Sequence, residues 1–230
     1  MIRALIFDCD GTLVDNEPLH MRSLNEALHA EGVTLTLPEY QRIMGPDDAA
    51  VRAALVLKGR PGDAAKVDAL VEAKRAVFRR SLAAGVSPVP GVAEFVRQAA
   101  AAYPCAVATG AWGDELGPVL DHLKIRECFR ALVTKEDCPV GKPDPAPFLR
   151  ALERLNAAAP PPEPPLAARD CLVFEDTPYG VAAARAAGMR CVGLTTSFTG
   201  DALRDADLVA PHFRALELRR VTAFFDRRAR

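Results

Sequence analysis

Short apolar runs recur along the chain and alternate with segments whose apolar residues have helical spacing, and this alternation constrains the fold most strongly. The runs occupy residues 4–7, 105–108, 131–133, 171–174, 191–194 and, more weakly, 208–209. Strands buried on both faces of a parallel sheet are almost uninterrupted apolar runs. Between two of them, Phe148, Leu149, Leu152 and Leu155 form the apolar stripe of a helix. The pattern predicts an α/β fold with a doubly wound parallel sheet.

Residues 16–86 interrupt this rhythm, because they contain helical patterns but no convincing strand. The residues of two apolar patterns are Leu24, Ala27 and Leu28, and then Val67, Leu70, Val71, Lys74 and Val77. Charged members such as Lys74 are expected to face water. We therefore expect a smaller helical domain inserted after the first strand, with residues 1–15 and 87–230 forming the core. The stretch 88–91 would be the return linker, because its prolines and glycine interrupt helix and sheet.

The composition argues against several classes of protein. With 29 basic and 30 acidic side chains and a formal net charge of −1, the chain of 230 residues offers no basic face for nucleic acid. No apolar run approaches the roughly 20 residues of a membrane span, and the first residues lack the features of a signal peptide. The six cysteines are scattered without a C-x-x-C pair. We expect a cytoplasmic protein, monomeric or weakly homodimeric, that binds neither nucleic acid nor membrane.

The segment Asp8-Cys9-Asp10-Gly11-Thr12 directly follows the first apolar run and carries the strongest chemical signal. If the chain turns after Asp8, both carboxylates converge on one site, and Gly11 permits such a turn and close approach to a ligand. Adjacent carboxylates repel each other and are costly without a cation to offset their charge. A hard divalent ion with oxygen ligands, of which Mg²⁺ fits best, would relieve this cost. The alternative interpretation is a solvated turn rich in Asp and Gly.

Further polar residues follow later apolar runs. Thr109 ends the second run, Lys142 follows the third, and Glu175 and Asp176 follow the fourth. Alone, each has an ordinary interpretation: a strand-terminal hydrogen-bonding group for Thr109, a solvated side chain for Lys142 and a helix cap for Asp176. Open α/β sheets bind ligands at the carboxyl ends of their strands. The conjunction with the first acidic segment therefore predicts a single active site.

These segments resemble, in order, the four motifs of the haloacid dehalogenase superfamily of phosphotransferases. The residues that carry the resemblance are Phe7 to Asp15, Thr109-Gly110, Gly141-Lys142-Pro143-Asp144-Pro145, and Phe174 to Gly180. The likeness covers nearly the whole chain and includes an insertion where the family has its helical cap. It implies a Rossmann-like core with a cap, and a Mg²⁺-dependent phosphatase that acts on a small phosphorylated metabolite through an aspartyl phosphate.

The resemblance also implies roles for the catalytic and metal-binding residues. Asp8 would be the nucleophile, and Asp10 would protonate the leaving oxygen and then accept a proton from water. Lys142 would supply a fixed positive charge. The metal would be held by the side chains of Asp8 and Asp176 and the backbone carbonyl of Asp10. Glu175 would be either a further ligand or a hydrogen-bond acceptor beside the metal.

Further residues are expected to contact the substrate. The Thr109 hydroxyl and the following backbone at Gly110 and Ala111 would hold the phosphoryl oxygens. His20 lies early in the first helix of the insertion and resembles a histidine near the hinge of some sugar-phosphate members. Gly45 lies in the loop 44–48, which is the segment expected to read the substrate.

Three alternatives remain beside the phosphatase. A β-phosphoglucomutase-like enzyme would return the phosphoryl group to the sugar, but such mutases have basic residues near the cap loop, where this chain has Asp47 and Asp48. The dehalogenase branch lacks an acid at the position of Asp10. A catalytically silent binding scaffold would usually have lost the nucleophile, whereas Asp8 is present.

Overall fold

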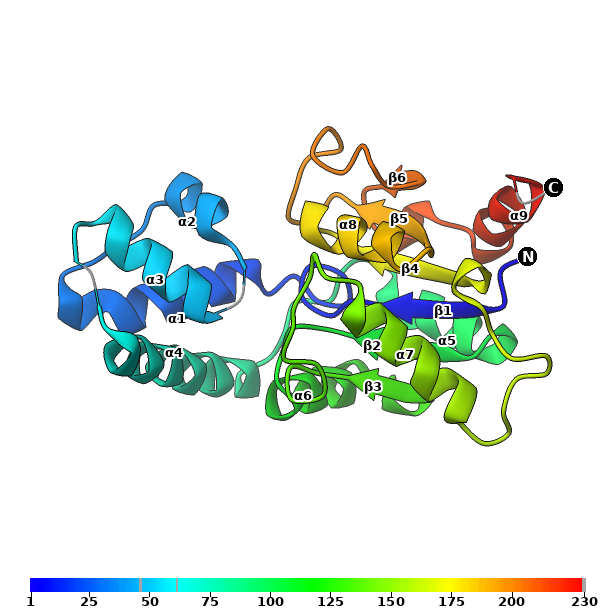
Figure 1. The fold of residues 1–230 in the computed structure, drawn as a ribbon, viewed down its shortest axis with the longest axis horizontal. Helices are drawn as coiled ribbons and strands as arrows, with labels where there is room; N and C mark the ends of the chain where they lie inside the picture. The colour runs from blue at the N-terminus through cyan, green and yellow to red at the C-terminus, as the bar shows by residue number, and fades with distance from the viewer. Residues whose placement is uncertain (46, 61, 229–230) are drawn as a thin grey trace. The chain divides into compact units, whose positions relative to one another are not determined.

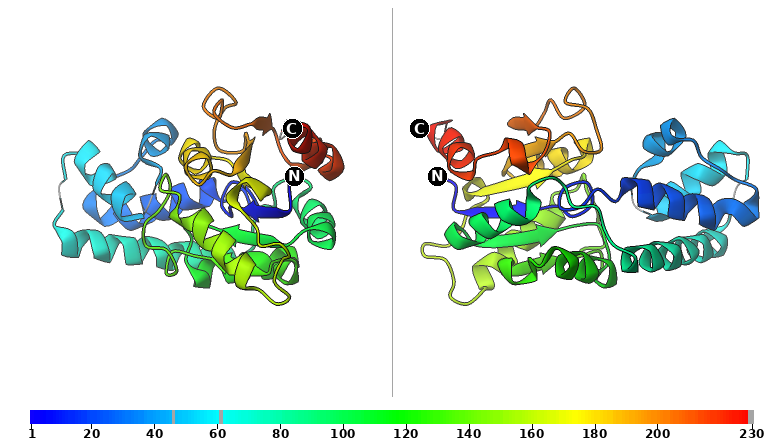
Figure 2. Two further views of the ribbon diagram at one scale, coloured as in Figure 1. Left: turned by 45° about the vertical axis from the view of Figure 1, so that its right-hand side comes forward. Right: turned by 180° about the vertical axis from the view of Figure 1, so that it is seen from behind.

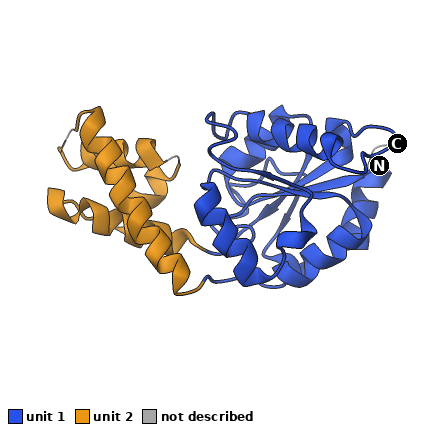
Figure 3. Cartoon of the chain, turned by 90° about the horizontal axis from the view of Figure 1, so that it is seen from below, with its two compact units in different colours: residues 1–15, 86–230 blue, residues 16–85 orange. Residues whose placement is uncertain are grey.

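The structure, a computed structural model, describes residues 1–45, 47–60 and 62–228. The chain divides into two compact units, one formed by residues 1–15 and 86–230 and the other by residues 16–85 (Figure 3). We call them the sheet unit and the helical unit. Within the described residues, no helix has both the length and the apolar character needed to cross a membrane.

The described residues of the sheet unit form one parallel sheet of six strands in the order β3-β2-β1-β4-β5-β6 (Figure 1). The strands are β1 (Ala4–Phe7), β2 (Cys105–Ala108), β3 (Ala131–Val133), β4 (Cys171–Glu175), β5 (Arg190–Leu194) and β6 (Leu208–Ala210). Every apolar run expected to be a strand is one, and the prediction of a doubly wound parallel sheet is confirmed. The order reverses between β1 and β4, which are hydrogen-bonded neighbours. Ligands of such sheets bind beyond the carboxyl ends of the strands at this reversal.

Helices cover both faces of the sheet (Figure 2). Those of the sheet unit are α5 (Val92–Ala102), α6 (Gly113–Leu123), α7 (Ala146–Ala157), α8 (Pro178–Ala186) and α9 (Leu218–Arg228), with short 3₁₀ turns η2 (Arg126–Cys128), η3 (Ala168–Asp170) and η4 (Phe213–Ala215). Helix α7 packs on β2 and β3, and α8 packs on β4 and β5. Alternate strand residues such as Ile6 and Val173 join this layer.

Aromatic residues form the opposite layer. The rings of Phe7 and Phe174, on neighbouring strands, stack with centroids 4.9 Å apart. Phe95 of α5 lies 5.3 Å from Phe174, and Phe213 of η4 lies 5.5 Å from it, centroid to centroid. Full burial of such side chains contributes about 1.5–3 kcal/mol each. The two layers fix β1 and β4, whose ends carry the acidic residues, within a rigid core.

The helical unit packs around its own apolar core. Its helices are α1 (Glu17–Leu28), α2 (Leu37–Ile43), α3 (Asp47–Leu57) and α4 (Ala64–Ala83), with the turn η1 (His29–Glu31). Helix α1 packs along α4, and α3 packs on both α2 and α4. Leu24, Leu28 and Val67 are among the buried residues. Asn25 fixes the following loop, because its amide both donates to and accepts from the backbone of Leu35, at 3.1 and 2.8 Å.

Lys74 corrects one expectation from the sequence. It was expected to face water, but its side chain is only 7 % exposed. Its ammonium forms an ion pair with Asp47 and lies 3.1 Å from His20 Nδ1. A buried charge is tolerated when it is paired and hydrogen-bonded. Helical spacing alone could not reveal these partners, which come from two other helices.

Candidate active site

A tight turn follows β1 and carries the first acidic segment. The carbonyl of Cys9 accepts hydrogen bonds from the backbone N–H groups of Thr12, Leu13 and Val14, at 3.2, 2.7 and 3.2 Å. Gly11 has a φ of +78°, which side chains of L-residues rarely adopt. A Cβ at Gly11 would fall 1.8 Å from Asp176 Oδ2, so the turn and the carboxylate after β4 are in close contact. This turn requires glycine at position 11.

Lys142 joins the ends of β1 and β4. Its ammonium donates to Asp8 Oδ1 at 2.5 Å and to Glu175 Oε1 at 2.6 Å. It also lies 4.8 Å from the centroid of the Phe148 ring, in the first turn of α7. Its side chain is 12 % exposed. The lysine is therefore a buried charge aimed at two carboxylates rather than a solvated surface group.

Glu175 has protein donors on both carboxylate oxygens. While Oε1 accepts from Lys142, Oε2 accepts from the N–H groups of Asp176 and Thr177 and from the Thr177 hydroxyl, at 2.9 to 3.0 Å. Thr177 Oγ1 in turn accepts from Gly180 N at 3.0 Å and so caps α8. A Cβ at Gly180 would lie within 2 Å of the carboxylate, so this glycine leaves room for Glu175. These contacts fix the orientation of Glu175.

Thr109 lies at the end of β2, and its side chain is held by the turn that follows. Its hydroxyl oxygen accepts from the N–H of Ala111 at 3.1 Å, which leaves the hydroxyl proton available for another acceptor. Its own N–H continues the sheet by donating to Val133 O at 3.0 Å. Gly110 is exposed, with no atom within 4 Å of the place where a Cβ would stand. The turn therefore presents open backbone beside a buried hydroxyl.

Buried carboxylates gather at this edge of the sheet. Asp8, Glu175 and Asp176 are all at most 7 % exposed, and Lys142 pairs with the first two. Burial raises the pKa of Asp8 against the attraction of Lys142, and repulsion from Glu175 and Asp10 adds to the rise. Burial would lower the pKa of Lys142, but the attraction of Asp8 and Glu175 outweighs it and raises that pKa. The site therefore holds several ionisable groups in a poorly solvated place.

This donor set fits a hard divalent cation. Among the described residues, no three His, Cys, Asp or Glu side chains form a complete metal site by themselves. Mg²⁺ usually takes only one or two carboxylates and completes its shell with water, backbone and phosphate oxygens. The buried carboxylates of Asp8 and Asp176 would supply these protein ligands, and the Gly11 turn is in contact with Asp176.

The two expected substrate contacts of the insertion lie in the helical unit. His20, in α1, stacks on Phe78 of α4 with centroids 4.0 Å apart, and its Nδ1 faces Lys74. Gly45 precedes α3, and a Cβ there would meet no atom within 4 Å. Pro46, in the middle of the expected substrate-reading loop, lies outside the described residues.

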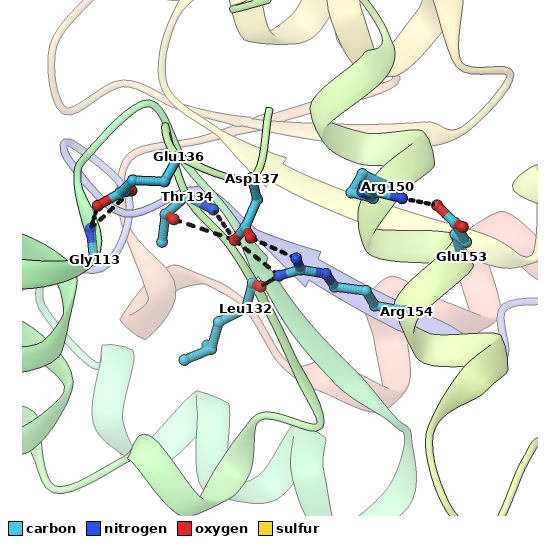
Figure 4. Close-up of polar contacts among 8 residues, drawn as sticks. All are labelled: Gly113, Leu132, Thr134, Glu136, Asp137, Arg150, Glu153 and Arg154. Atoms are coloured by element: carbon cyan, nitrogen blue, oxygen red, sulfur yellow. Dashed lines mark hydrogen bonds and ion pairs between the residues drawn. The ribbon is translucent and has the colours of Figure 1, made fainter. Parts of the chain in front are cut away.

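Sequence reasoning missed several polar residues near this edge. Ser197 follows β5, and its buried hydroxyl has no hydrogen-bond partner among the described residues. The Ser197 oxygen would lie 2.7 Å from a Cβ at Gly11, beside Asp176. The run Thr195-Thr196-Ser197 directly after an apolar run was an available signal. Asp137 and Arg154 form an ion pair beside the segment that carries Lys142 (Figure 4). No pattern in the sequence indicates that these two residues pair.

Comparisons with known proteins show the family and the fold. The chain is 33 % identical over 226 residues to protein CbbY (plasmid) of Cupriavidus necator. The matched region covers 92 % of this chain and 85 % of the relative. It is 32 % identical over 190 residues to the fructose-1-phosphate phosphatase YqaB of Escherichia coli, covering 82 % and 94 %. The fold matches a β-phosphoglucomutase from Clostridium difficile with a TM-score of 0.87 at 20 % identity, covering 100 % and 99 %. The model of the haloacid dehalogenase-like hydrolase family matches residues 2–188, so the chain belongs to this family.

Proposed function

We propose that the protein is a Mg²⁺-dependent phosphatase that hydrolyses a small phosphate monoester through a phosphorylated Asp8. The observation that carries the proposal is the Lys142 ammonium held between Asp8 and Glu175 at 2.5 and 2.6 Å. Uncatalysed hydrolysis of phosphate monoesters is among the slowest biological reactions. A site that gathers cations around one carboxylate offsets the repulsion between a phosphate and an anionic nucleophile.

The chain's own residues divide the reaction into two steps. Asp8 attacks phosphorus as the ester P–O bond breaks, and the leaving oxygen takes a proton from Asp10. Asp10 then removes a proton from water, whose oxygen attacks the phosphoryl group and restores the Asp8 carboxylate. Thr109 donates a hydrogen bond from its hydroxyl to a phosphoryl oxygen and the N–H of Gly110 donates to another, while the N–H of Ala111 orients the Thr109 hydroxyl by donating to its oxygen.

Mg²⁺, when bound, supplies positive charge to the phosphoryl oxygens. Asp8 and Asp176 would hold it with their side chains, and Asp10 with its backbone carbonyl. Glu175 was expected to be either a ligand or an acceptor beside the metal. Because both of its oxygens already accept from protein donors, we assign Glu175 the second role, which is to orient Lys142.

A sugar phosphate is the substrate class that we favour. The support is the likeness, over most of both chains, to a relative named fructose-1-phosphate phosphatase. His20 and Gly45 would contact the sugar from the helical unit. The Nδ1 of His20 lies 3.1 Å from the ammonium of Lys74, which fixes the orientation of the ring.

The test is a panel of phosphate monoesters assayed for phosphate release with Mg²⁺ and with excess chelator, using wild type and Asp8→Asn. We expect turnover that requires Mg²⁺ and that falls by several orders of magnitude in the variant. Sugar phosphates should be the best substrates. Metal-independent turnover, or equal turnover by both proteins, would contradict the mechanism.

A β-phosphoglucomutase-like mutase is the second candidate, because its fold matches this chain over its full length. The cap loop presents Asp47 and Asp48, and Asp47 pairs with Lys74 inside the helical unit. Because the charge of Lys74 is already paired with Asp47, it is not available to bind a second phosphate. Comparing isomer formation with phosphate release from a hexose 1-phosphate separates the two activities, and we expect phosphate release to dominate.

A further inference from the structure

An ion pair closes the loop between β3 and α7, which carries Lys142. Arg154, in the third turn of α7, donates to both oxygens of Asp137, at 2.8 and 2.5 Å (Figure 4). Asp137 Oδ2 also accepts from the backbone and the hydroxyl of Thr134, at 3.1 and 3.2 Å. Arg154 donates in addition to the carbonyl of Leu132 in β3. One guanidinium thus fixes the end of a strand and the start of the loop at once.

The same stretch of loop is bound to the turn that follows Thr109. The N–H of Lys135 donates to Ala111 O at 2.9 Å. The N–H of Gly113, the first residue of α6, donates to both carboxylate oxygens of Glu136, at 3.0 and 3.1 Å (Figure 4). A carboxylate at a helix N-terminus is favoured by the unpaired N–H groups and by the helix dipole.

Helix α7 also holds the far end of the loop. Asp144 Oδ1 accepts from Ala146 N at 2.8 Å at the start of the helix. Phe148, one turn further, places its ring beneath the ammonium of Lys142. The segment 137–148 is therefore attached to α7 at both ends. Its first residue, Asp137, pairs with Arg154 of the helix, and its last residues form the first turn of the same helix. Both ends of the Lys142 loop are fixed to one rigid element.

We propose that Asp137, Arg154 and Glu136 are positioning residues that hold Lys142 and the Thr109 turn in register with each other. This inference rests on the proposed phosphatase function. Two groups that bind the same phosphoryl oxygens must keep a fixed separation, and a displacement of about 1 Å can cost on the order of 100-fold in rate. Arg154 suits the role because its planar fork binds a carboxylate through two parallel hydrogen bonds.

Electrostatics supports this geometry. The hydrogen bond from Arg154 lowers the pKa of Asp137 to about 2, so the carboxylate is ionised throughout the neutral range. A second arginine pair on the same helix supplies a matched control. Arg150 donates to Glu153 at 2.7 Å, and both side chains are exposed, at 46 and 65 % (Figure 4). Among the described residues no hydrogen bond joins this pair to the loop, although the charge of Arg150 interacts weakly with that of Asp137.

The experiment compares Asp137→Asn, Arg154→Gln and Glu136→Gln with Arg150→Gln at a temperature where thermal melts show each protein folded. Titration calorimetry with inorganic phosphate, in the presence of Mg²⁺, reports the phosphoryl-binding site without turnover. Hydrogen exchange of the backbone amides reports where the structure loosens. Asp137→Asn is nearly isosteric, so it carries the test if Arg154→Gln does not fold.

We expect Asp137→Asn to weaken phosphate binding about tenfold and to lower kcat/KM by about 10- to 100-fold. Exchange should quicken in residues 138–145 but not in β1 or β4. In the Lys142→Met background, Asp137→Asn should change phosphate affinity less than about twofold, because residues that act through a shared partner are not additive. Arg150→Gln should change every measurement far less than Asp137→Asn does, because its pair is exposed to solvent.

Two results would overturn the proposal: phosphate affinity equal in Asp137→Asn and Arg150→Gln, or an undiminished effect of Asp137→Asn when Lys142 is absent. Phosphate binding by a wild-type protein that hydrolyses no ester would refute the phosphatase function, while the binding comparison would still decide on the positioning role. A wild-type protein that binds no phosphate would refute both.

Discussion

Lys142 in the sheet unit and Lys74 in the helical unit are both buried ammonium groups, but their surroundings differ. Lys142 bridges two carboxylates at the ends of neighbouring strands, and the buried Asp176 directly follows one of them. Lys74 is paired with one carboxylate, Asp47, and with the imidazole of His20. The first arrangement gives the lysine two carboxylate partners, whereas the second gives it one carboxylate and one imidazole. Burial of a lysine therefore does not by itself indicate a reaction site, because structural ion pairs bury lysines as well.

The largest difference should appear in catalysis. Lys142→Met should lower kcat/KM by about 10³-fold or more, since loss of one preorganised donor to a developing charge costs on the order of 10²–10³-fold and a full charge is removed here. Steady-state phosphate release measures this. A loss below tenfold would mean that Lys142 does not touch the phosphoryl group.

The second difference should appear in stability. Lys74→Met leaves Asp47 without its partner, and removal of one member of a buried pair costs about 3–5 kcal/mol. Because the Asp47 side chain is 23 % exposed, we expect about 2 kcal/mol in urea unfolding. Lys66, on the same helix, is the control. It pairs with Glu31, but its side chain is 42 % exposed.

Lys66→Met should change the free energy of unfolding by less than about 1 kcal/mol. Equal effects of the two substitutions would show that Lys74 is not buried as described. A loss of kcat in Lys74→Met as large as that of Lys142→Met would remove the distinction between the two lysines.

The smallest effect concerns a partly exposed pair and depends on pH. Arg154 lowers the pKa of Asp137 to about 2 in the folded protein, against an ordinary value of 3.8. A lowered carboxyl pKa stabilises the folded state above the ordinary value, and the contribution is lost as pH falls through the folded value. Since the pair is partly exposed, we expect about 1 kcal/mol after solvent screening.

Urea unfolding of wild type and Asp137→Asn from pH 7 to about pH 2 measures this contribution. The difference in free energy of unfolding should stay constant above about pH 5 and shrink between about pH 4 and 2. A difference that does not change with pH would mean that the carboxylate charge contributes nothing and that only its hydrogen bonds matter.

Patterns local in sequence predicted most of the fold. Each expected strand is present because strands buried on both faces need uninterrupted apolar runs. Within α7 the apolar stripe was less accurate, because Leu149 is 42 % exposed while Phe148 and Leu155 are buried. A stripe gives the face of a helix but not how far the neighbouring elements cover it.

The candidate site was predictable where residues follow strand ends, since the sheet brings those ends together. Asp8, Thr109 and Glu175 are in this group. Partners contributed by helices were not predictable in the same way. Lys74 meets His20 and Asp47 only after the helices pack, and Arg154 meets Asp137 across 17 residues of loop and helix. No spacing rule specifies such contacts, so they required the structure.

Covalent phosphorylation of Asp8 tests the central claim most directly. The protein would be mixed with its best phosphate ester and Mg²⁺, quenched in acid within one turnover, and digested for mass spectrometry. We predict one phosphoryl group on the peptide that contains Asp8, in wild type but not in Asp8→Asn. Full turnover with no phosphorylated peptide, or a phosphoryl group on a different residue, would contradict the account.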